Sequence, residues 1–317
     1  MASSFSSEAD LLVVGGDSMI GTAAAKAARA RGLRVVVTTR RPGMDTPQTL
    51  PLDLADPGGW GWVADLRVAT VFLCAAVARL DACHIDPEGS ARVNVTGTVE
   101  LARRLMAQGA HVIHLSSNQV FKGDAPSPAE DAPVSPANTY GAQKAEAERS
   151  LLALVPPPGR PAATILRLTK VIHPGMPLFT GWIDQLAAGR VVRPARDMAL
   201  APVTVDLVVE AMLALADRGR EDPAAVPGIF HLSATDEISY AEAAAFVARR
   251  QGADAGLMQA VDSVAAGYLR EQPPRHTIMA TGRLRRLTGI MPPGAEAALS
   301  ACLPAPSAPN VRIRGKR

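Results

Sequence analysis

The chain has 317 residues, of which 48% are apolar, 20% charged and only 4% aromatic, and its formal net charge is +3 at pH 7. This length suits one large α/β domain with an elaboration, or two domains that share a cleft, and the composition is that of a globular protein. The small charge and the scattered arginines form no basic stripe, which argues against nucleic acid as a partner.

The cysteines and the first residues indicate the compartment. Cys74, Cys83 and Cys302 are odd in number and lack CxxC or metal spacing, so we expect free thiols in a reducing compartment and no metal site. Residues 1–10 lack the charged start and apolar run of a signal peptide, and no stretch reaches the roughly 20 apolar residues that span a bilayer. We therefore expect a cytoplasmic protein with no membrane partner.

Short apolar runs alternate with helix-forming segments in the first half of the chain. Strands are expected at 11–14, 33–38, 68–76, 111–116, 163–168 and 228–232, and helices at 23–30, 94–108 and 140–154. Strands that alternate with helices predict βαβ units, and therefore an α/β fold with a doubly wound parallel sheet of the Rossmann type.

The remaining segments are rich in helix formers, Pro and Gly, which predicts a smaller, helix-rich substrate lobe. We place a dinucleotide-binding Rossmann domain at 1–173, with 203–232 returning to it. The substrate lobe is expected at 174–202 and 233–303, and a flexible tail at 304–317 because that stretch lacks periodicity.

A glycine-rich segment joins the first strand to the first helix. In this position a turn lets backbone N–H groups and a helix N-terminus approach a pyrophosphate. Ser18 stands where a middle glycine is expected, so a plain tight turn stays an alternative. The cofactor-binding candidates are Gly15, Asp17, Ser18, Met19, Ile20 and Gly21.

Two arginines follow the second strand, where a site that prefers NAD usually has a carboxylate for the ribose 2′-hydroxyl. Arg40 and Arg41 can instead form charge-assisted, forked hydrogen bonds with a 2′-phosphate. We therefore predict NADP(H) rather than NAD(H), with two exposed loop arginines as the alternative.

Tyr140 and Lys144 are four residues apart at the start of a predicted helix, so both side chains point to the same side. A nearby ammonium stabilises a phenolate, so we expect Lys144 to lower the pKa of Tyr140 and make it a usable general acid/base. Ser117 ends a predicted strand at the edge where open α/β sheets bind ligands, and is expected to hold a carbonyl oxygen beside Tyr140. Asn94 is interpreted as a helix N-cap, with a ligand group as the alternative.

Taken in order, these motifs resemble the extended short-chain dehydrogenase/reductase superfamily. The matching segments are 15–21, Asp53-Leu54, Ala75-Ala76, 94–98, Ser116-Ser117 and 140–144, and the run 115–123 with Glu130 and Pro136 looks most like dTDP-4-dehydrorhamnose reductases. The resemblance implies catalytic Ser117, Tyr140 and Lys144, and cofactor contacts from Asp53, Leu54, Ala75, Ala76 and Lys144. It also implies that the enzyme is a homodimer and that it catalyses the NADP-dependent reduction of a nucleotide-activated keto sugar.

The departures from the family pattern lie on the substrate side. Asn118-Gln119 replaces Asp-Tyr, and Leu168-Thr169-Lys170 replaces a stretch that usually contains an aromatic residue. Softer matches at 165–167, 202–207 and 274–276 extend the resemblance over most of the chain. The candidate substrate-binding residues are Ser117, Asn118, Arg193 and Arg275. The two arginines are included because a guanidinium group suits a pyrophosphate.

Two other functions stay open. A nucleotide-sugar epimerase or dehydratase resembles the same superfamily but recycles its nicotinamide within each turnover. A non-catalytic, cofactor-binding regulatory subunit keeps the fold without the chemistry. Retention of Ser117, Tyr140 and Lys144 together argues against the regulatory subunit, because a binding module does not need a proton donor.

Overall fold

The computed structural model of the protein describes residues 8–41, 48–269 and 273–305. Seven strands form one parallel sheet in the order β10-β6-β5-β4-β1-β2-β3. They are β1 Glu8–Val14, β2 Val35–Thr39, β3 Thr49–Pro51, β4 Arg67–Leu73, β5 His111–Ser117, β6 Thr164–Leu168 and β10 Gly228–Leu232. The strand order reverses between β1 and β4, as in a doubly wound sheet, so the predicted fold class is confirmed.

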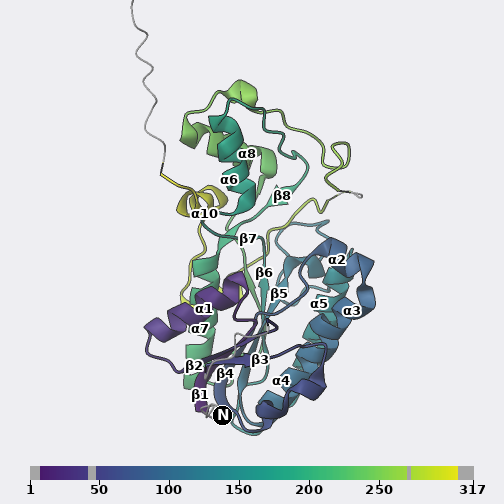
Figure 1. Cartoon of the computed structure of the whole chain (residues 1–317), viewed down its shortest axis with the longest axis vertical. Helices are drawn as coiled ribbons and strands as arrows, with labels where there is room; N and C mark the ends of the chain where they lie inside the picture. Colours follow the sequence, from purple (N-terminus) through teal and green to yellow (C-terminus); the bar gives the residue numbers. More distant parts are fainter. Residues whose placement is uncertain (1–7, 42–47, 270–272, 306–317) are drawn as a thin grey trace, which may run out of the picture.

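Helices cover both faces of the sheet (Figure 1). One face packs against α1 Met19–Ala30, α7 Val205–Glu221 and α9 Gly282–Thr288, and the other against α4 Thr98–Ala107 and α5 Thr139–Leu152, with α2 Leu80–Ile85 and α3 Pro87–Ala91 beside α5. Neighbouring strand residues alternate between the two cores, as Ile165 and Leu166 do. Because both faces are buried, the strands are almost continuously apolar.

A smaller body lies beyond the carboxyl ends of the strands, at the top of Figure 1. It contains α6 Pro177–Ala187, α8 Tyr240–Gln251 and α10 Ala295–Cys302, which share a separate apolar core. Two short strand pairs accompany it, β7 Val171–Ile172 with β9 Val203–Thr204 and β8 Ala199–Leu200 with β11 Ile238–Ser239. The predicted helix-rich lobe is therefore present.

The stretch predicted to return to the sheet contains α7 and β10. α7 packs against α1, and β10 pairs with β6 in parallel. The exact residue bounds of the two predicted domains stay a prediction, and the predicted tail lies outside the described residues from 306 onward. Within the described ranges, no helix is long and apolar enough to span a bilayer.

A buried ion pair fastens α5 to the sheet. Glu148 on α5 accepts from Nε and Nη2 of Arg167 on β6, at 2.9 and 2.6 Å. Ser116 on β5 donates to the same carboxylate at 2.5 Å, and Nη1 of Arg167 lies 3.2 Å from Nε2 of His231 on β10. Because each buried charge is paired and hydrogen-bonded, the desolvation cost is offset and α5 keeps a fixed position over β5 and β6.

Some bounds differ from the prediction. α1 begins at Met19 rather than 23 because Ser18 caps it, and β4 ends at Leu73 rather than 76. The helix expected from residue 94 begins earlier, since α3 continues through a π-helical turn, Arg92–Gly97, into α4. Asn94 therefore lies inside a helix, and its interpretation as an N-cap is wrong.

Candidate active site

The turn after β1 needs glycines because its backbone lies very close to neighbouring parts of the chain. Gly15 has φ of +83°, in the left-handed region that favours glycine. A Cβ on Gly16 would lie 2.5 Å from Cβ of Val37, and a Cβ on Gly21 would lie 2.1 Å from the carbonyl oxygen of Gly15. Any side chain at these two positions would push the turn away from β2 or open it.

Ser18 completes the turn that its sequence position had put in question. Its hydroxyl donates to the carbonyl of Gly15 at 2.7 Å and accepts from the backbone N–H of Gly21 at 3.0 Å. It is thus the N-cap of α1. The amides of Met19 and Ile20, in the first turn of α1, have no acceptor within the helix, and this arrangement suits an anionic group.

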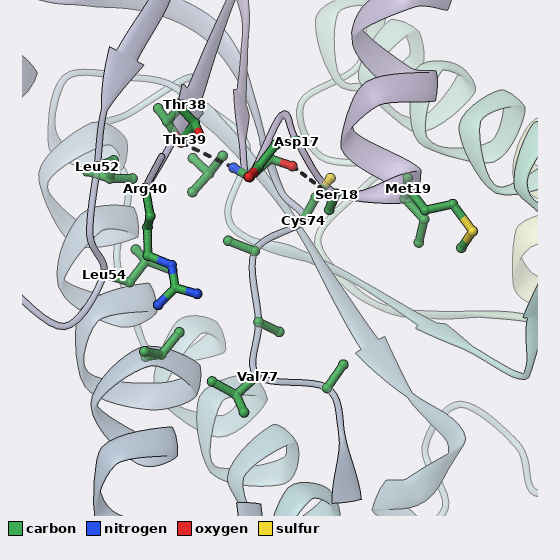
Figure 2. Close-up of a pocket in the computed structure, with 17 residues that line it drawn as sticks. Asp17, Ser18, Met19, Thr38, Thr39, Arg40, Leu52, Leu54, Cys74 and Val77 are labelled. Atoms are coloured by element: carbon green, nitrogen blue, oxygen red, sulfur yellow. Dashed lines mark hydrogen bonds between the residues drawn. The ribbon is translucent and has the colours of Figure 1, made fainter. Parts of the chain in front are cut away.

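A cavity of about 370 Å³ opens beside this turn, at the carboxyl ends of β1, β2 and β4 (Figure 2). Nine of the predicted cofactor residues line it, namely Gly15, Asp17, Ser18, Met19, Ile20, Arg40, Leu54, Ala75 and Ala76. The cavity lining also includes residues that were not predicted, namely Thr38, Thr39, Leu52, Cys74 and Val77. The signal in the sequence that could have found them is their position at or near the ends of strands.

Four predicted cofactor residues are not among those that line the cavity. The backbone of Gly21 lies against the carbonyl of Gly15 within the turn. The carboxylate of Asp53 accepts a hydrogen bond from the backbone N–H of Ala55 at 2.9 Å. Arg41 forms an ion pair with Asp17, and Lys144 donates to the carbonyl of Leu115.

The two arginines after β2 have different surroundings. Nε of Arg41 lies 3.1 Å from a carboxylate oxygen of Asp17, and the Arg41 side chain is 67% exposed. Arg40 lines the cavity, and Figure 2 shows its side chain extending beside Leu54. Arg40 is therefore placed to meet a ligand in the cavity, whereas Arg41 is engaged in an exposed ion pair.

Ser117 and Tyr140 meet at the carboxyl end of β5. Ser117 ends β5; its hydroxyl accepts from the backbone N–H of Gln119 at 3.2 Å, donates to Oδ1 of Asn118 at 3.4 Å, and lies close enough to Tyr140 to lower the pKa of the phenol. Asn138 caps α5 by accepting from the N–H of Gly141 at 2.8 Å. A Cβ on Gly141 would lie 2.0 Å from the carbonyl oxygen of Gln119, so the glycine lets the helix start pack directly on the loop that follows Ser117.

The structure brings the ammonium group of Lys144 over the ring of Tyr140. Nζ of Lys144 donates to the carbonyl of Leu115 at 2.8 Å, lies 3.4 Å from Nε2 of His114 and is 5.9 Å from the centroid of the Tyr140 ring. The side chain is fully enclosed, and burial lowers the pKa of Lys144 to about 8. Lys144 therefore remains mostly charged at pH 7.

The expected effect of Lys144 on the tyrosine is wrong for this arrangement. Burial and, to a smaller extent, the nearby Cys83 thiol raise the pKa of Tyr140 to about 12, against the lowering effect of Ser117. A phenol with a raised pKa stays protonated at neutral pH. Tyr140 is thus held in the form that donates a proton.

The predicted substrate residues fall in two places. Nδ2 of Asn118 donates to the carbonyl of Thr277 at 3.3 Å, and the N–H of His276 donates to the carbonyl of Gly123 at 3.0 Å. The exposed Arg275 belongs to this segment, which therefore runs beside the loop that follows Ser117.

Arg193 lies elsewhere, in the smaller body. It lines a second cavity of about 230 Å³ together with Trp182, Gln185, Val191, Val192 and Tyr268. The hydroxyl of Tyr268 donates to the carbonyl of Arg193 at 2.9 Å. Neither cavity has both Arg193 and Arg275 in its lining.

The described part of the chain contains no group of three His, Cys, Asp or Glu side chains that could hold a metal ion. The three cysteines are free thiols, as expected.

Comparison with known proteins gives three findings. The family model of the RmlD substrate binding domain matches residues 9–306. A dTDP-4-keto-6-deoxy-D-glucose reductase of Streptomyces niveus is 30% identical over 274 residues, which cover 84% of this chain and 87% of that protein. The methionine adenosyltransferase 2 subunit beta of Xenopus tropicalis is 27% identical over 56% of this chain and 53% of its own length.

Among solved structures, the dTDP-4-dehydrorhamnose reductase of Bacillus anthracis, crystallised in complex with NADP, superposes with a TM-score of 0.74. The two share 18% sequence identity, and the superposition covers 93% of this chain and 98% of that one. This likeness extends the fold comparison over both bodies of the molecule.

Proposed function

Because this chain belongs to the RmlD substrate binding domain family, as its motifs predicted, we propose that it is an NADP-dependent oxidoreductase that reduces the keto group of a nucleotide-activated sugar. One observation carries the proposal. Ser117, Tyr140 and Lys144 meet at the carboxyl edge of the sheet, where Ser117 ends β5 and the Lys144 ammonium lies 5.9 Å from the centroid of the Tyr140 ring.

The residues around the larger cavity fit a dinucleotide. Gly15, Gly16 and Gly21 keep the turn flat against its neighbours, and the amides of Met19 and Ile20 are available to a diphosphate. Arg40 offers a guanidinium to a 2′-phosphate, which favours NADP(H) over NAD(H). Asp17, Leu54, Ala75 and Ala76 would form the walls.

The chemistry of the remaining groups suits reduction. A bound reduced nicotinamide supplies the hydride. Ser117 and Tyr140 both lie at the carboxyl end of β5, so a carbonyl oxygen placed between them would accept hydrogen bonds from both hydroxyls as negative charge develops on it. The Tyr140 phenol would then give its proton to that oxygen, and Ser117, which lowers the pKa of Tyr140, would favour this transfer.

We propose that the nucleotide part of the substrate lies toward the smaller body. The second cavity combines the aromatic side chains of Trp182 and Tyr268 with the guanidinium of Arg193 and the amide of Gln185. Aromatic faces suit a base, and arginine suits a diphosphate. Arg275 and Asn118, beside the loop after Ser117, would then contact the sugar or its phosphates.

The experiment is the loss of NADPH absorbance with purified protein and a panel of nucleotide-linked 4-keto-6-deoxy sugars, with NADH in parallel. Stoichiometric oxidation of NADPH with one sugar, and slower oxidation of NADH, is the expected result. Conversion of a sugar without net loss of NADPH would replace the reductase by an epimerase or dehydratase.

A second candidate is a binding subunit of another enzyme, and one observation favours it. A similar protein is named as the beta subunit of methionine adenosyltransferase 2, and it is similar over about half of each chain. Tight NADPH binding with no turnover of any sugar in the panel would support this function over the reductase.

We also propose that the protein is a cytoplasmic homodimer. The free cysteines suit a reducing compartment. α4 and α5 lie side by side on one face, and several of their charged residues are paired within the same helix: Glu100 with Arg103 and Arg104, and Glu146 with Arg149. Light scattering during size-exclusion chromatography measures the mass directly, and a monomeric mass would refute the dimer.

A further inference from the structure

Gln143 stands directly before Lys144 on α5, and its buried amide is fully hydrogen-bonded. Its Oε1 accepts from Nδ2 of Asn94 at 2.8 Å. Its Nε2 donates to the carbonyl of Pro87 at 3.0 Å and to the hydroxyl of Ser90 at 2.8 Å. One acceptor and both donor hydrogens of the amide are therefore in use, all with groups outside α5.

Asn94 carries the connection on to the wall of the cofactor cavity. Its Oδ1 accepts from the backbone N–H of Val77 at 2.8 Å, and its Nδ2 donates to the Val77 carbonyl at 3.0 Å. Val77 lines the cavity, and its carbonyl also accepts from Sγ of the fully buried Cys83 at 3.2 Å. Two amide side chains thus span the distance from the cavity wall to the helix of Tyr140 and Lys144.

We propose that Gln143 is a positioning residue, which through Asn94 fixes Tyr140 and Lys144 relative to the Val77 segment of the cofactor cavity. This inference rests on the proposed function for the roles of those two residues. Such a network has few alternative arrangements, because every change leaves a buried donor or acceptor unpaired.

Its position on the helix explains why Gln143 suits this task. Residue 143 lies between the two functional side chains of α5, and it faces α3 and the π-helical turn while Glu148 ties the next turn of α5 to Arg167. α5 is therefore held on one side by the sheet and on the other by the cavity wall. Without Gln143, this part of the helix would lose its side-chain hydrogen bonds to α3 and to the π-helical turn.

The test compares Gln143→Met, which keeps the length of the side chain but removes its hydrogen bonds, with the matched control Thr164→Val. Thr164 is also buried; its hydroxyl donates to the Val226 carbonyl at 2.7 Å and lies 2.8 Å from Nε2 of His111, at the amino end of β6 and away from the cavity. We expect Gln143→Met to lower kcat at least tenfold with a smaller change in KM for the sugar, and Thr164→Val to leave kcat within twofold. Both variants should lower the Tm.

A second readout does not depend on the proposed reaction. Labelling with iodoacetamide followed by mass spectrometry reports how often each thiol becomes accessible. We expect the labelling rate of Cys83 to rise at least tenfold in Gln143→Met and to stay unchanged in Thr164→Val, with Cys302 as the internal reference. A wild-type protein that oxidises no NADPH would remove the proposed function, while this labelling would still test the attachment.

Ser90→Ala provides a milder variant, should Gln143→Met not fold. It removes one acceptor of the Gln143 amide and is expected to give the same two changes at about threefold. Unchanged kcat and unchanged Cys83 labelling in a folded variant, with only a lower Tm as in Thr164→Val, would reduce Gln143 to a purely structural role and overturn the proposal.

Discussion

The cofactor cavity and the proposed substrate side of this molecule are built in different ways. The cavity is lined mostly by short pieces of chain that follow β1, β2, β3 and β4, so the sheet itself places them. The substrate side depends on contacts between distant segments, such as Asn118 with Thr277 and Tyr268 with Arg193. The cofactor site is therefore encoded locally, and the substrate site is encoded by long-range packing.

One carboxylate illustrates how much the substrate side depends on single side chains. Glu237 accepts from the backbone N–H groups of Thr277 and Ile278 at 2.7 and 3.1 Å, and lies 2.6 Å from Nδ1 of His276. These hydrogen bonds lower the pKa of Glu237 against the opposing effect of burial. The segment that carries Arg275 is thus held in place by Glu237, which is distant from it in the sequence. A substitution of Glu237 is therefore expected to alter the proposed substrate site without altering the sheet.

The largest expected effect separates chemistry from cofactor binding. Tyr140→Phe removes the proton donor and keeps the ring, so kcat should fall about 10²- to 10⁴-fold, the usual contribution of a general acid. Because the phenol does not line the larger cavity, the Kd for NADPH should change less than twofold. Stopped-flow NADPH oxidation and fluorescence titration measure the two quantities.

Full activity of Tyr140→Phe would contradict the proposed mechanism. Phe substitution at Tyr268 serves as the control, because that hydroxyl contacts only the Arg193 carbonyl in the smaller body among the described residues. It should affect KM for the sugar more than kcat.

The next prediction perturbs the local, cofactor side. Gly21→Ala places a Cβ 2.1 Å from the Gly15 carbonyl oxygen, and since neither backbone can yield without opening the turn, overpacking of about 1–3 kcal/mol is expected. The Kd for NADPH should rise by up to about 100-fold. Gly181→Ala in α6 is the control, because its Cβ meets nothing within 4 Å, and it should leave the Kd unchanged. Equal affinity in the two variants would show that the turn does not hold the cofactor.

The contrast between the two sides also explains what the sequence could predict. The doubly wound parallel sheet, the glycine turn and the proximity of Ser117 to Tyr140 follow from local patterns and from the rule that parallel strands end at one edge. Ser18 was the doubtful position, yet its hydroxyl makes the hydrogen bonds that keep the turn closed. A cap of this kind is a local property and was within reach of the sequence.

Other features could not be read from the sequence because they depend on burial and on distant partners. Lys144 points to the Leu115 carbonyl, and burial rather than its charge dominates the pKa of Tyr140. Asn94 bonds to Val77 instead of capping a helix, since the helix begins about two turns earlier, at Pro87. Gln143 gave no signal at all, because its partners come from segments about 50 residues away.

The free energy of unfolding should depend on pH because His111 is buried in the body that contains the sheet. Burial lowers its pKa to about 4 from 6.5, so only the unfolded state binds a proton between these values. Stability from this group is complete above pH 6.5 and is lost as the pH falls toward 4. Between pH 7 and 5 the free energy of unfolding should fall by about 2 kcal/mol through His111.

His111→Gln isolates that contribution. Nε2 of His111 lies 2.8 Å from the hydroxyl of Thr164, and the Gln amide can keep this hydrogen bond without titrating. Urea unfolding at pH 7 and 5 should show a loss in the variant that is about 2 kcal/mol smaller than in the wild type. Parallel losses in both proteins would mean that other groups cause the acid sensitivity.

The smallest expected effect concerns Arg40, where the charge of a side chain, rather than the shape of the backbone, is proposed to recognise the cofactor. Arg40→Ala should raise the Kd for NADPH about tenfold, since a hydrogen bond to a charged group contributes roughly 1.5–3 kcal/mol and part of it is replaced by water. The Kd for NADH should change less than twofold. Arg41→Ala is the matched control: its guanidinium pairs with Asp17 at the surface, so the loss in NADPH affinity should stay below threefold. If Arg41→Ala weakened NADPH binding more than Arg40→Ala, the 2′-phosphate would belong to Arg41, and the Asp17 ion pair would have to open when the cofactor binds.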